Sequence, residues 1–298
     1  MSAPKKTFAL FGHPVGHSLS PPIHRAAYDE LGLRDCEYVA LDCPDEASVR
    51  ARFEALRRGD LAGANVTVPW KLLALALADE RDPSARDTGA ANVLVRDAAR
   101  GRIVAHNTDV PALSDELARG VPRPRRALVI GNGGAALAAV AACRALGAER
   151  VAVVARRFRG ADEGAWERAD EFRKLGAVVL GWPDDALRRE ALAREASALD
   201  LVVQSTSDGM RGASDGTSVR EALPWGALPK SAFVYDVVYN PRVTPFVVAA
   251  RAHGLAAESG LGMLVLQAAR AVELWLGERP PFLPLLRAAE RALAEKFG

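Results

Sequence analysis

Short runs of β-forming apolar residues alternate with amphipathic helical stretches along the whole chain, and this alternation constrains the fold more than any other feature. Its clearest instance comprises a strand expected at Ala127–Ile130, a helix at Ala135–Leu146 and a strand at Val151–Ala155. Gly147 follows the helix directly, in the place where glycine commonly ends helices. This order is typical of α/β proteins with parallel strands, so we predict an α/β fold.

The chain is too long for one core of ordinary size. Its 298 residues suggest about two domains. Residues 120–126 contain two prolines and three arginines, which predict an exposed linker between two series of elements. Two last helices are expected at Leu261–Leu276 and Phe282–Glu295, and we expect one of them to pack back onto the first half of the chain.

Charge and composition exclude several classes of partner. A net charge of +2 provides no strong field for nucleic acid or an anionic membrane, and no apolar run is long enough to span a bilayer. The three cysteines lack C-x-x-C spacing and the five histidines form no H-x-x-x-H or H-E-x-x-H pair, so we predict neither a disulfide framework nor a metal site. These observations favour a cytoplasmic protein that acts on small molecules.

The loop between the strand at Ala127–Ile130 and the following helix has the composition of a dinucleotide site. It reads Gly131, Asn132, Gly133, Gly134, Ala135. Gly131 permits a tight turn, Gly133 lets backbone N–H groups approach a pyrophosphate, and small residues at 134 and 135 allow close packing of strand and helix. A glycine-rich turn without a ligand is the alternative.

Arginines follow the next strand of this unit. Dinucleotide sites that bind NAD usually place an acidic residue here for the ribose hydroxyls, but this chain has Arg156, Arg157 and Arg159. Because arginine pairs well with phosphate, the run favours NADP over NAD. A solvated run of surface arginines is the alternative interpretation.

Polar residues cluster in the first half of the chain where strands are expected to end. Ser18 and Ser20 precede a helix expected at Pro21–Leu31, where their hydroxyls suit a carboxylate; simple N-capping by Ser20 is an equally good interpretation. Lys71 lies in the first turn of another expected helix, where a cation is disfavoured by the helix dipole, which hints at a function.

Two further polar residues, Asn92 and Asp109, belong to segments at other expected strand ends. Open α/β sheets bind ligands beyond the carboxyl ends of their strands. Asn92, Asp109 and Lys71 can therefore converge on one site.

Together these segments resemble the shikimate dehydrogenase family over nearly the whole chain. The motifs in the first half are His17–Pro21 (H-S-x-S-P), Asn65–Lys71 (N-V-T-x-P-x-K), Gly89–Asn92 (G-A-x-N) and Asn107–Asp109 (N-T-D). The motifs in the second half are Gly131–Ala135, Tyr235–Pro241, Thr244–Pro245 and Gly260–Gln267. Each motif alone is modest evidence, but their joint order and spacing are specific.

The resemblance implies two α/β domains. Residues 1–110 would bind the substrate, with 261–298 packing back on them, and residues 111–260 would form a Rossmann-like NADP-binding domain. The implied activity is the reversible NADPH-dependent reduction of 3-dehydroshikimate to shikimate, a step of aromatic amino-acid and chorismate biosynthesis.

The resemblance also implies roles for individual residues. Lys71 and Asp109 would be catalytic. The substrate-binding residues would be Ser18, Ser20, Thr67, Asn92, Tyr239 and Gln267. The cofactor-binding residues would be Gly131, Asn132, Gly133, Gly134, Ala135, Arg156, Val237 and Gly260, to which the arginine run adds Arg157.

The chain departs from the family pattern at several positions. They are Arg25, Val93, Ala155, Arg157 and Gln204, where the family commonly has Asn, Thr, Asn, Thr and Asn.

Two alternative functions stay open: a quinate or dual quinate/shikimate dehydrogenase, and a non-catalytic dinucleotide sensor of the same fold. The oligomeric state, monomer or homodimer, also stays open. The relative shares of Lys71 and Asp109 in proton transfer also stay open.

Overall fold

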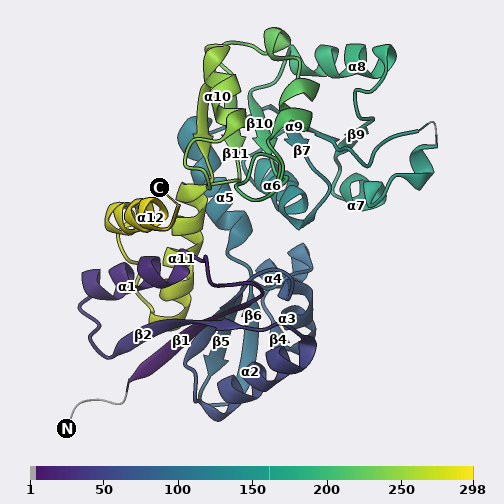
Figure 1. Ribbon diagram of the computed structural model, residues 1–298. Coiled ribbons are helices and arrows are strands. Elements are labelled where there is room, and N and C mark those ends of the chain that lie inside the picture. The colour runs from purple at the N-terminus through teal and green to yellow at the C-terminus, as the bar shows by residue number, and fades with distance from the viewer. Residues whose placement is uncertain (1–4, 161, 298) are drawn as a thin grey trace. The chain divides into compact units, whose positions relative to one another are not determined.

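The computed structural model describes residues 5–160 and 162–297, and the chain forms two compact α/β units (Figure 1). Unit 1 comprises Met1–Ala112 and Leu264–Gly298, and unit 2 comprises Leu113–Met263. Within the described ranges, no helix is both long and apolar enough to cross a membrane.

Unit 1 is built on a six-stranded sheet with the order β2-β1-β3-β5-β6-β4. Its strands are β1 (Lys6–Gly12), β2 (Cys36–Asp42), β3 (Gly63–Val66), β4 (Glu80–Arg81), β5 (Val93–Asp97) and β6 (Arg102–His106). Its helices in the first half of the chain are α1 (Ser20–Glu30), α2 (Glu46–Arg58), α3 (Lys71–Leu77) and α4 (Pro83–Thr88). The unit is thus an α/β layer structure.

One strand of this sheet runs against the predicted parallel pattern. β5 pairs antiparallel with both β3 and β6, so the expectation of parallel strands throughout is wrong for unit 1. The physical reason is the connection: only the residues between Asp97 and Arg102 join β5 to β6, which suffices for a hairpin, whereas a parallel crossover needs a dozen or more residues.

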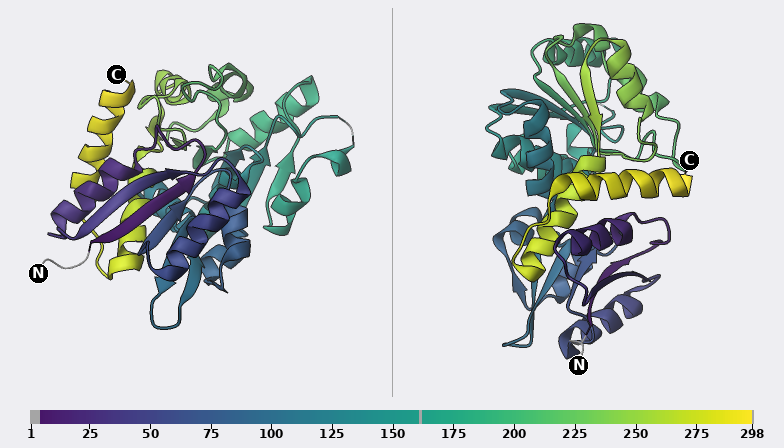
Figure 2. Two further views of the ribbon diagram at one scale, coloured as in Figure 1. Left: turned by 60° about the horizontal axis from the view of Figure 1, so that its bottom comes forward. Right: turned by 90° about the vertical axis from the view of Figure 1, so that its left-hand side faces the viewer.

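The end of the chain belongs to unit 1. α11 (Leu261–Leu276) begins in unit 2 and continues into unit 1, and α12 (Phe282–Phe297) packs against α1 (Figure 2). Trp275 of α11 stacks on Phe8 of β1 with 4.7 Å between ring centroids, and its indole N–H donates to the carbonyl of Leu94 at 3.0 Å. These contacts join the last helices to the sheet formed by the first hundred residues.

Unit 2 is a fully parallel sheet with the order β12-β11-β10-β7-β8-β9. Its strands are β7 (Arg126–Ile130), β8 (Arg150–Val154), β9 (Val178–Leu180), β10 (Leu201–Gln204), β11 (Phe233–Asp236) and β12 (Ala256–Ser259). Read from β7 as the first strand, this is the 3-2-1-4-5-6 order of the Rossmann fold. In that fold the ligand binds where the strand order reverses, which here is between β7 and β10.

Helices and short 3₁₀ turns precede or connect the strands of unit 2. They are α5 (Asp109–Gly120, which begins in unit 1), α6 (Gly134–Ala145), α7 (Ala169–Lys174), α8 (Ala186–Ala196), α9 (Thr217–Ala222), α10 (Pro245–Ala252), and the 3₁₀ turns Glu163–Ala165 and Trp225–Ala227. The Thr244 hydroxyl caps α10 by accepting the backbone N–H of Val247 at 3.2 Å, as the Thr-Pro pair predicts. The segment predicted as a linker, 120–126, lies within unit 2, because the unit boundary falls inside α5 rather than after it.

Candidate functional site

Lys71 is positioned by the turn between β3 and α3. The chain leaves the sheet after Val66, the backbone N–H of Thr67 still donates to the carbonyl of Phe11 at 2.9 Å, and α3 begins at Lys71 itself. The lysine thus lies beyond the carboxyl end of a central strand with its side chain partly exposed.

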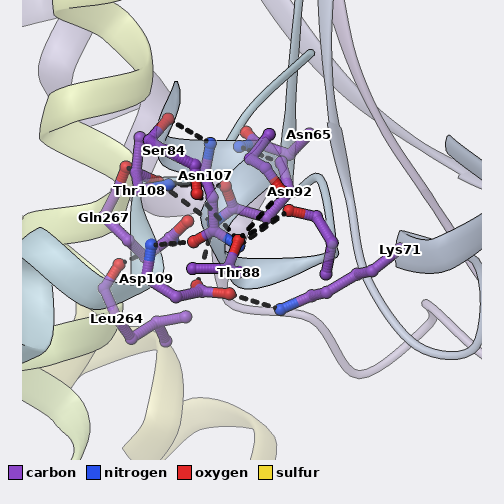
Figure 3. Close-up of polar contacts among 12 residues, drawn as sticks. Asn65, Lys71, Ser84, Thr88, Asn92, Asn107, Thr108, Asp109, Leu264 and Gln267 are labelled. Atoms are coloured by element: carbon purple, nitrogen blue, oxygen red, sulfur yellow. Dashed lines mark hydrogen bonds and ion pairs between the residues drawn. The ribbon is translucent and has the colours of Figure 1, made fainter. Parts of the chain in front are cut away.

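Lys71, Asp109 and Asn92 form a chain of hydrogen bonds (Figure 3). The Lys71 ammonium donates to Oδ2 of Asp109 at 2.7 Å, and the Asn92 amide Nδ2 donates to Oδ1 of the same carboxylate at 2.8 Å. The side chains of Lys71 and Asp109 are 32% and 18% exposed, so the ion pair is half-buried yet open on one side. Lys71 and Asn92, which are distant in the sequence, therefore donate to the same carboxylate, that of Asp109.

Backbone groups hold the Asn92 side chain in this orientation. Its Oδ1 accepts the backbone N–H of Thr108 at 2.8 Å, and its Nδ2 also donates to the Thr108 hydroxyl at 3.0 Å. The N–H of Asp109 donates to Oδ1 of Asn107 at 2.9 Å. Asn107, which is buried, donates through Nδ2 to the carbonyl of Ala90 at 2.9 Å. The Asp109 carboxylate is thereby fixed from both its backbone and its side chain.

Several residues of this network were not among the predicted site residues. Asn65 accepts a hydrogen bond from the Tyr38 hydroxyl at 2.8 Å and donates to the carbonyl of Asn92 at 3.2 Å. Asn107 and Thr108 orient Asp109 and Asn92 as described above. The signal that could have found them is their place inside the N-V-T and N-T-D motifs, where polar residues end buried strands.

The Ser18–Ser20 loop precedes α1. The backbone N–H of Ser20 donates to the Ser18 hydroxyl oxygen at 3.1 Å, and Ser20 is already the first residue of the helix. The N-cap residue is Leu19, which makes no side-chain capping bond, so the interpretation of Ser20 as an N-cap is wrong. Lys296 of α12 donates to the carbonyl of Ser18 at 2.8 Å and joins the end of the chain to this loop.

Two predicted substrate residues, Gln267 and Tyr239, differ in their surroundings. The Gln267 carbonyl accepts a hydrogen bond from the Thr108 hydroxyl at 3.2 Å, while its side-chain amide donates to the carbonyl of Leu264 at 2.8 Å. The backbone of Gln267 thus touches the Asn92 network in unit 1. Tyr239 follows β11 in unit 2, where burial raises its pKa.

The glycine loop of unit 2 lies between β7 and α6. Gly131 has a φ of +136°, and a Cβ placed there would lie 2.7 Å from the Ser205 hydroxyl, so a side chain is excluded. A Cβ at Gly133 or Gly134 would instead meet no protein atom within 4 Å. The first turn of α6 carries no acidic residue, and its N-cap, Gly133, makes no side-chain hydrogen bond. An open glycine surface at an uncapped helix N-terminus fits a pyrophosphate.

Arg156 and Arg157 follow β8 beside this loop, as the hydrogen bond from Gly131 N–H to the Val154 carbonyl at 2.9 Å shows. Both arginine side chains are exposed. Arg157 forms a long ion pair with Glu167, whose Oε2 lies 3.6 Å from the arginine Nε. No acidic residue follows β8 directly, and the site therefore fits a phosphorylated ribose.

Val237 and Gly260 lie together at the carboxyl ends of β11 and β12. A Cβ on Gly260 would be 2.1 Å from the carbonyl oxygen of Val237, so only glycine allows this approach. The N–H of Gly260 donates to the Val238 carbonyl at 3.0 Å. These predicted cofactor residues thus belong to one backbone cluster. In the part of the chain that the structure describes, no group of three or more metal-ligating side chains occurs.

Comparison with known proteins matches this arrangement to one family. The family model described as the shikimate dehydrogenase substrate binding domain matches residues 10–94, and the model of the shikimate 5'-dehydrogenase C-terminal domain matches residues 260–290. A shikimate dehydrogenase (NADP(+)) of Thermus thermophilus is 39% identical over 96% of this chain and 98% of its own length.

Solved structures share the fold of this chain. The structure of Thermus thermophilus shikimate 5-dehydrogenase in complex with NADP(H) and shikimate has a TM-score of 0.79 at 34% identity, covering 96% of this chain and 99% of that one. The ligand-free 5-ketofructose reductase of a Gluconobacter species has a TM-score of 0.82 at 25% identity, covering 97% and 99%. On the full-length identity to curated relatives and the matching domain models, the chain belongs to the shikimate dehydrogenase family.

Proposed function

We propose that this protein is an NADP-dependent shikimate dehydrogenase, which reversibly reduces 3-dehydroshikimate to shikimate in aromatic amino-acid biosynthesis. The observation that carries this proposal is the Lys71–Asp109–Asn92 hydrogen-bond chain, which lies in a unit with the family's substrate-binding domain. The relatives at full length carry the same activity in their names.

Lys71 is positioned for proton transfer. When bound, NADPH supplies the hydride that reduces the ring ketone. An ammonium group has three donors, and Lys71 uses one of them on Asp109. Among the described residues its Nζ has no other hydrogen-bond partner, so the remaining donors are available to the ketone oxygen, to which Lys71 gives a proton as the alkoxide develops. Asp109 orients the ammonium, and the pair takes the hydroxyl proton in the reverse reaction.

Other polar residues would hold the substrate. Ser18 and Ser20 would bind the carboxylate, which the loop geometry supports because Ser18 already accepts one N–H at the start of α1. Thr67 and Asn92 would contact the ring hydroxyls from unit 1. Tyr239 and Gln267 would complete the set of substrate contacts.

The residues of unit 2 would hold NADP. The open surface of Gly131–Ala135 at the N-terminus of α6 supports binding of the pyrophosphate there. Exposed Arg156 and Arg157 would pair with the 2′-phosphate. Val237 and Gly260 would line the NADP site. We accordingly propose residues 1–110 with 261–298 as the substrate domain and 111–260 as the NADP domain.

A spectrophotometric assay tests the proposed function. The purified protein is incubated with shikimate or quinate against NADP or NAD, and formation of the reduced nicotinamide is followed. Turnover of shikimate with NADP in clear preference to the other three combinations is expected. Equal or faster turnover of quinate would favour the quinate or dual enzyme instead. Binding of NADPH without any turnover would favour the dinucleotide sensor.

Two further properties are proposed with the function. A cytoplasmic location is supported by Cys36, Cys43 and Cys143, which are all free thiols. A homodimer stays a prediction from the family resemblance. Light scattering after size-exclusion chromatography, over a hundredfold range of protein concentration, distinguishes dimer from monomer.

A further inference from the structure

The segment that follows β8 leads to Arg168, which contacts the glycine loop. The rings of Phe158 and Trp166 stack with 5.6 Å between centroids, and the Trp166 indole N–H donates to the carbonyl of Arg159 at 2.8 Å. These contacts hold Trp166 against Phe158 and Arg159. Arg168 follows directly, and its Nη1 donates to the carbonyl of Asn132 at 3.2 Å. Arg168, in addition to Arg156 and Arg157, is thus an arginine beside the loop that would bind the cofactor.

Arg168 is held in an unusual backbone conformation. Its φ is +64°, and in the described part of the chain it is the one non-glycine residue with a positive φ. A left-handed conformation costs a non-glycine residue about 1 kcal/mol, and such strain concentrates at ligand sites. This residue is also the N-cap of α7.

One carboxylate fixes the orientation of the guanidinium. Glu171 accepts from Nε and Nη2 of Arg168 at 2.8 Å each, in a bidentate pair. Nη1 is therefore the group that faces Asn132. The Arg168 side chain remains about one-third exposed, so one of its N–H groups can reach an additional ligand without breaking the pair with Glu171.

The location of Arg168 indicates what that ligand would be. In a Rossmann fold, the adenosine ribose is recognised at the end of the second strand, beside the glycine loop of the first. Here those positions are the residues after β8, which include Arg156 and Arg157, and the loop containing Asn132. Arg168 is bonded to that loop, and an arginine near this point accommodates a 2′-phosphate rather than a free ribose hydroxyl.

We infer that Arg168, bonded to the Asn132 carbonyl and clamped by Glu171, is a specificity-determining residue that contacts the 2′-phosphate of NADP. This inference rests on the proposed NADP-dependent function and adds to Arg156 and Arg157, which the sequence predicts as cofactor-binding residues.

The test compares calorimetric binding of 2′,5′-ADP and 5′-AMP, which differ only in the 2′-phosphate and require no turnover. Arg168→Gly is the primary variant, because glycine adopts the left-handed backbone without strain while the guanidinium is removed. Arg168→Lys keeps the charge without the bidentate fork. Arg173→Ala is the matched control, since Arg173 lies in the same helix and pairs with Asp170 at 2.9 Å.

We expect Arg168→Gly to bind 2′,5′-ADP about tenfold or more weakly, with the affinity for 5′-AMP changed less than about twofold. Arg168→Lys should lie in between, and Arg173→Ala should bind both ligands like the wild type. Equal weakening of both ligands, or none, in Arg168→Gly would overturn the inference. If the wild-type protein itself did not prefer 2′,5′-ADP, the NADP assignment would fail as well, which separates the two failures.

Discussion

Lys71 and Asp109 are each ordinary charged residues until their surroundings are considered. The lysine retains donors beyond its 2.7 Å bond to Asp109, and the carboxylate is fixed by Asn92 and by the backbone after β6. A fully exposed ion pair of this kind would contribute little to the free energy of folding. At a partly buried site, however, the same pair can present a proton in a fixed direction.

Replacement of Lys71 tests this assignment. Lys71→Ala should lower kcat by about 10²–10⁴-fold with only a small change in KM for shikimate, because general acid–base help is lost while the other substrate contacts remain. Steady-state kinetics in both directions measure the effect. Lys6→Ala, which removes a largely exposed lysine from β1, serves as the control. A near-normal kcat in Lys71→Ala would contradict the assignment.

The glycine loop contains glycines that are required for different reasons. Gly131→Ala should lower the thermal unfolding temperature, because φ is +136° and the added Cβ would lie 2.7 Å from the Ser205 hydroxyl. Gly133→Ala meets no protein atom within 4 Å, so it should fold nearly as well yet bind NADPH more weakly. Thermal unfolding and calorimetric NADPH titration measure the two effects. Undiminished NADPH affinity in Gly133→Ala would argue against a pyrophosphate at this loop.

At the scale of elements, α12 stabilises the loop that precedes α1. The Lys296 ammonium donates to the carbonyls of Ser18 and Gly16 at 2.8 and 3.4 Å, and the Phe297 ring lies 5.9 Å from that of His17. The last turn of the chain therefore restrains the loop that would bind the substrate carboxylate.

Lys296→Gln should raise KM for 3-dehydroshikimate about three- to tenfold and leave kcat and KM for NADPH unchanged, because a charge-assisted hydrogen bond of about 1–2 kcal/mol orders the loop. Lys296→Arg should restore most of the affinity. Arg291→Gln, which changes an exposed cation on the same helix, is the control. A fall in kcat rather than a rise in KM would indicate a different role for Lys296.

A buried carboxylate joins three elements of unit 2. Asp236, at the end of β11, accepts hydrogen bonds from Gln204 of β10 at 3.1 Å, from the Thr244 hydroxyl that caps α10 at 2.6 Å, and from the N–H of Val238 at 3.0 Å. Burial, with a smaller contribution from the nearby carboxylate of Asp208, raises the pKa of Asp236 to about 7. The network therefore holds a proton that the unfolded chain would release.

Stability should depend on pH through this group. An unfolded aspartate loses its proton near pH 4, so the folded state binds more protons between about pH 4 and pH 7, and stability falls as pH rises through that window. The effect is at most about 4 kcal/mol. Asp236→Asn, which is neutral at all these values, should remove it. Urea unfolding of both proteins at about pH 5 and about pH 8 measures the difference. Identical pH dependence in wild type and variant would refute this account.

At the scale of the whole molecule, the chain begins and ends in the same unit. Unit 1 is completed by residues after Leu264, and unit 2 is one continuous segment between its two parts. The proposed proton-transferring residues therefore lie in a discontinuous unit, and the glycine loop lies in a continuous one. Mutations in the last helix should consequently affect the proposed substrate unit rather than the nucleotide unit.

Leu285 tests this division. Its side chain is fully buried on α12, so Leu285→Ala should destabilise unit 1 by about 2–4 kcal/mol while calorimetric binding of 2′,5′-ADP stays near the wild-type value. Leu283→Ala on the same helix removes a leucine that is 59% exposed, and should change stability by less than about 1 kcal/mol. Equal effects of the two substitutions would contradict the packing of α12 on unit 1.

Local features of the fold follow from the sequence. The helix at Leu261–Leu276 has the predicted bounds, and the strand predicted at Ala127–Ile130 is observed at Arg126–Ile130. Thr244 caps α10, as a threonine before a first-turn proline predicts. Hydrophobic periodicity and capping depend on neighbours a few residues apart, which a sequence displays directly. The two residues of β4, by contrast, are too short to leave such a pattern.

The sequence by itself determined the α/β class, the NADP-dependent family and the motif residues, because each depends on local order and spacing. Only the tertiary structure decided which of those residues meet. The Lys71–Asp109 bond joins positions 38 residues apart, and the Lys296–Ser18 bond joins positions 278 apart. Arg168 belongs to none of the motifs, and its bond to Asn132 spans 36 residues. Such contacts depend on how distant segments pack and on which polar groups they bury together. A local sequence pattern therefore does not predict them.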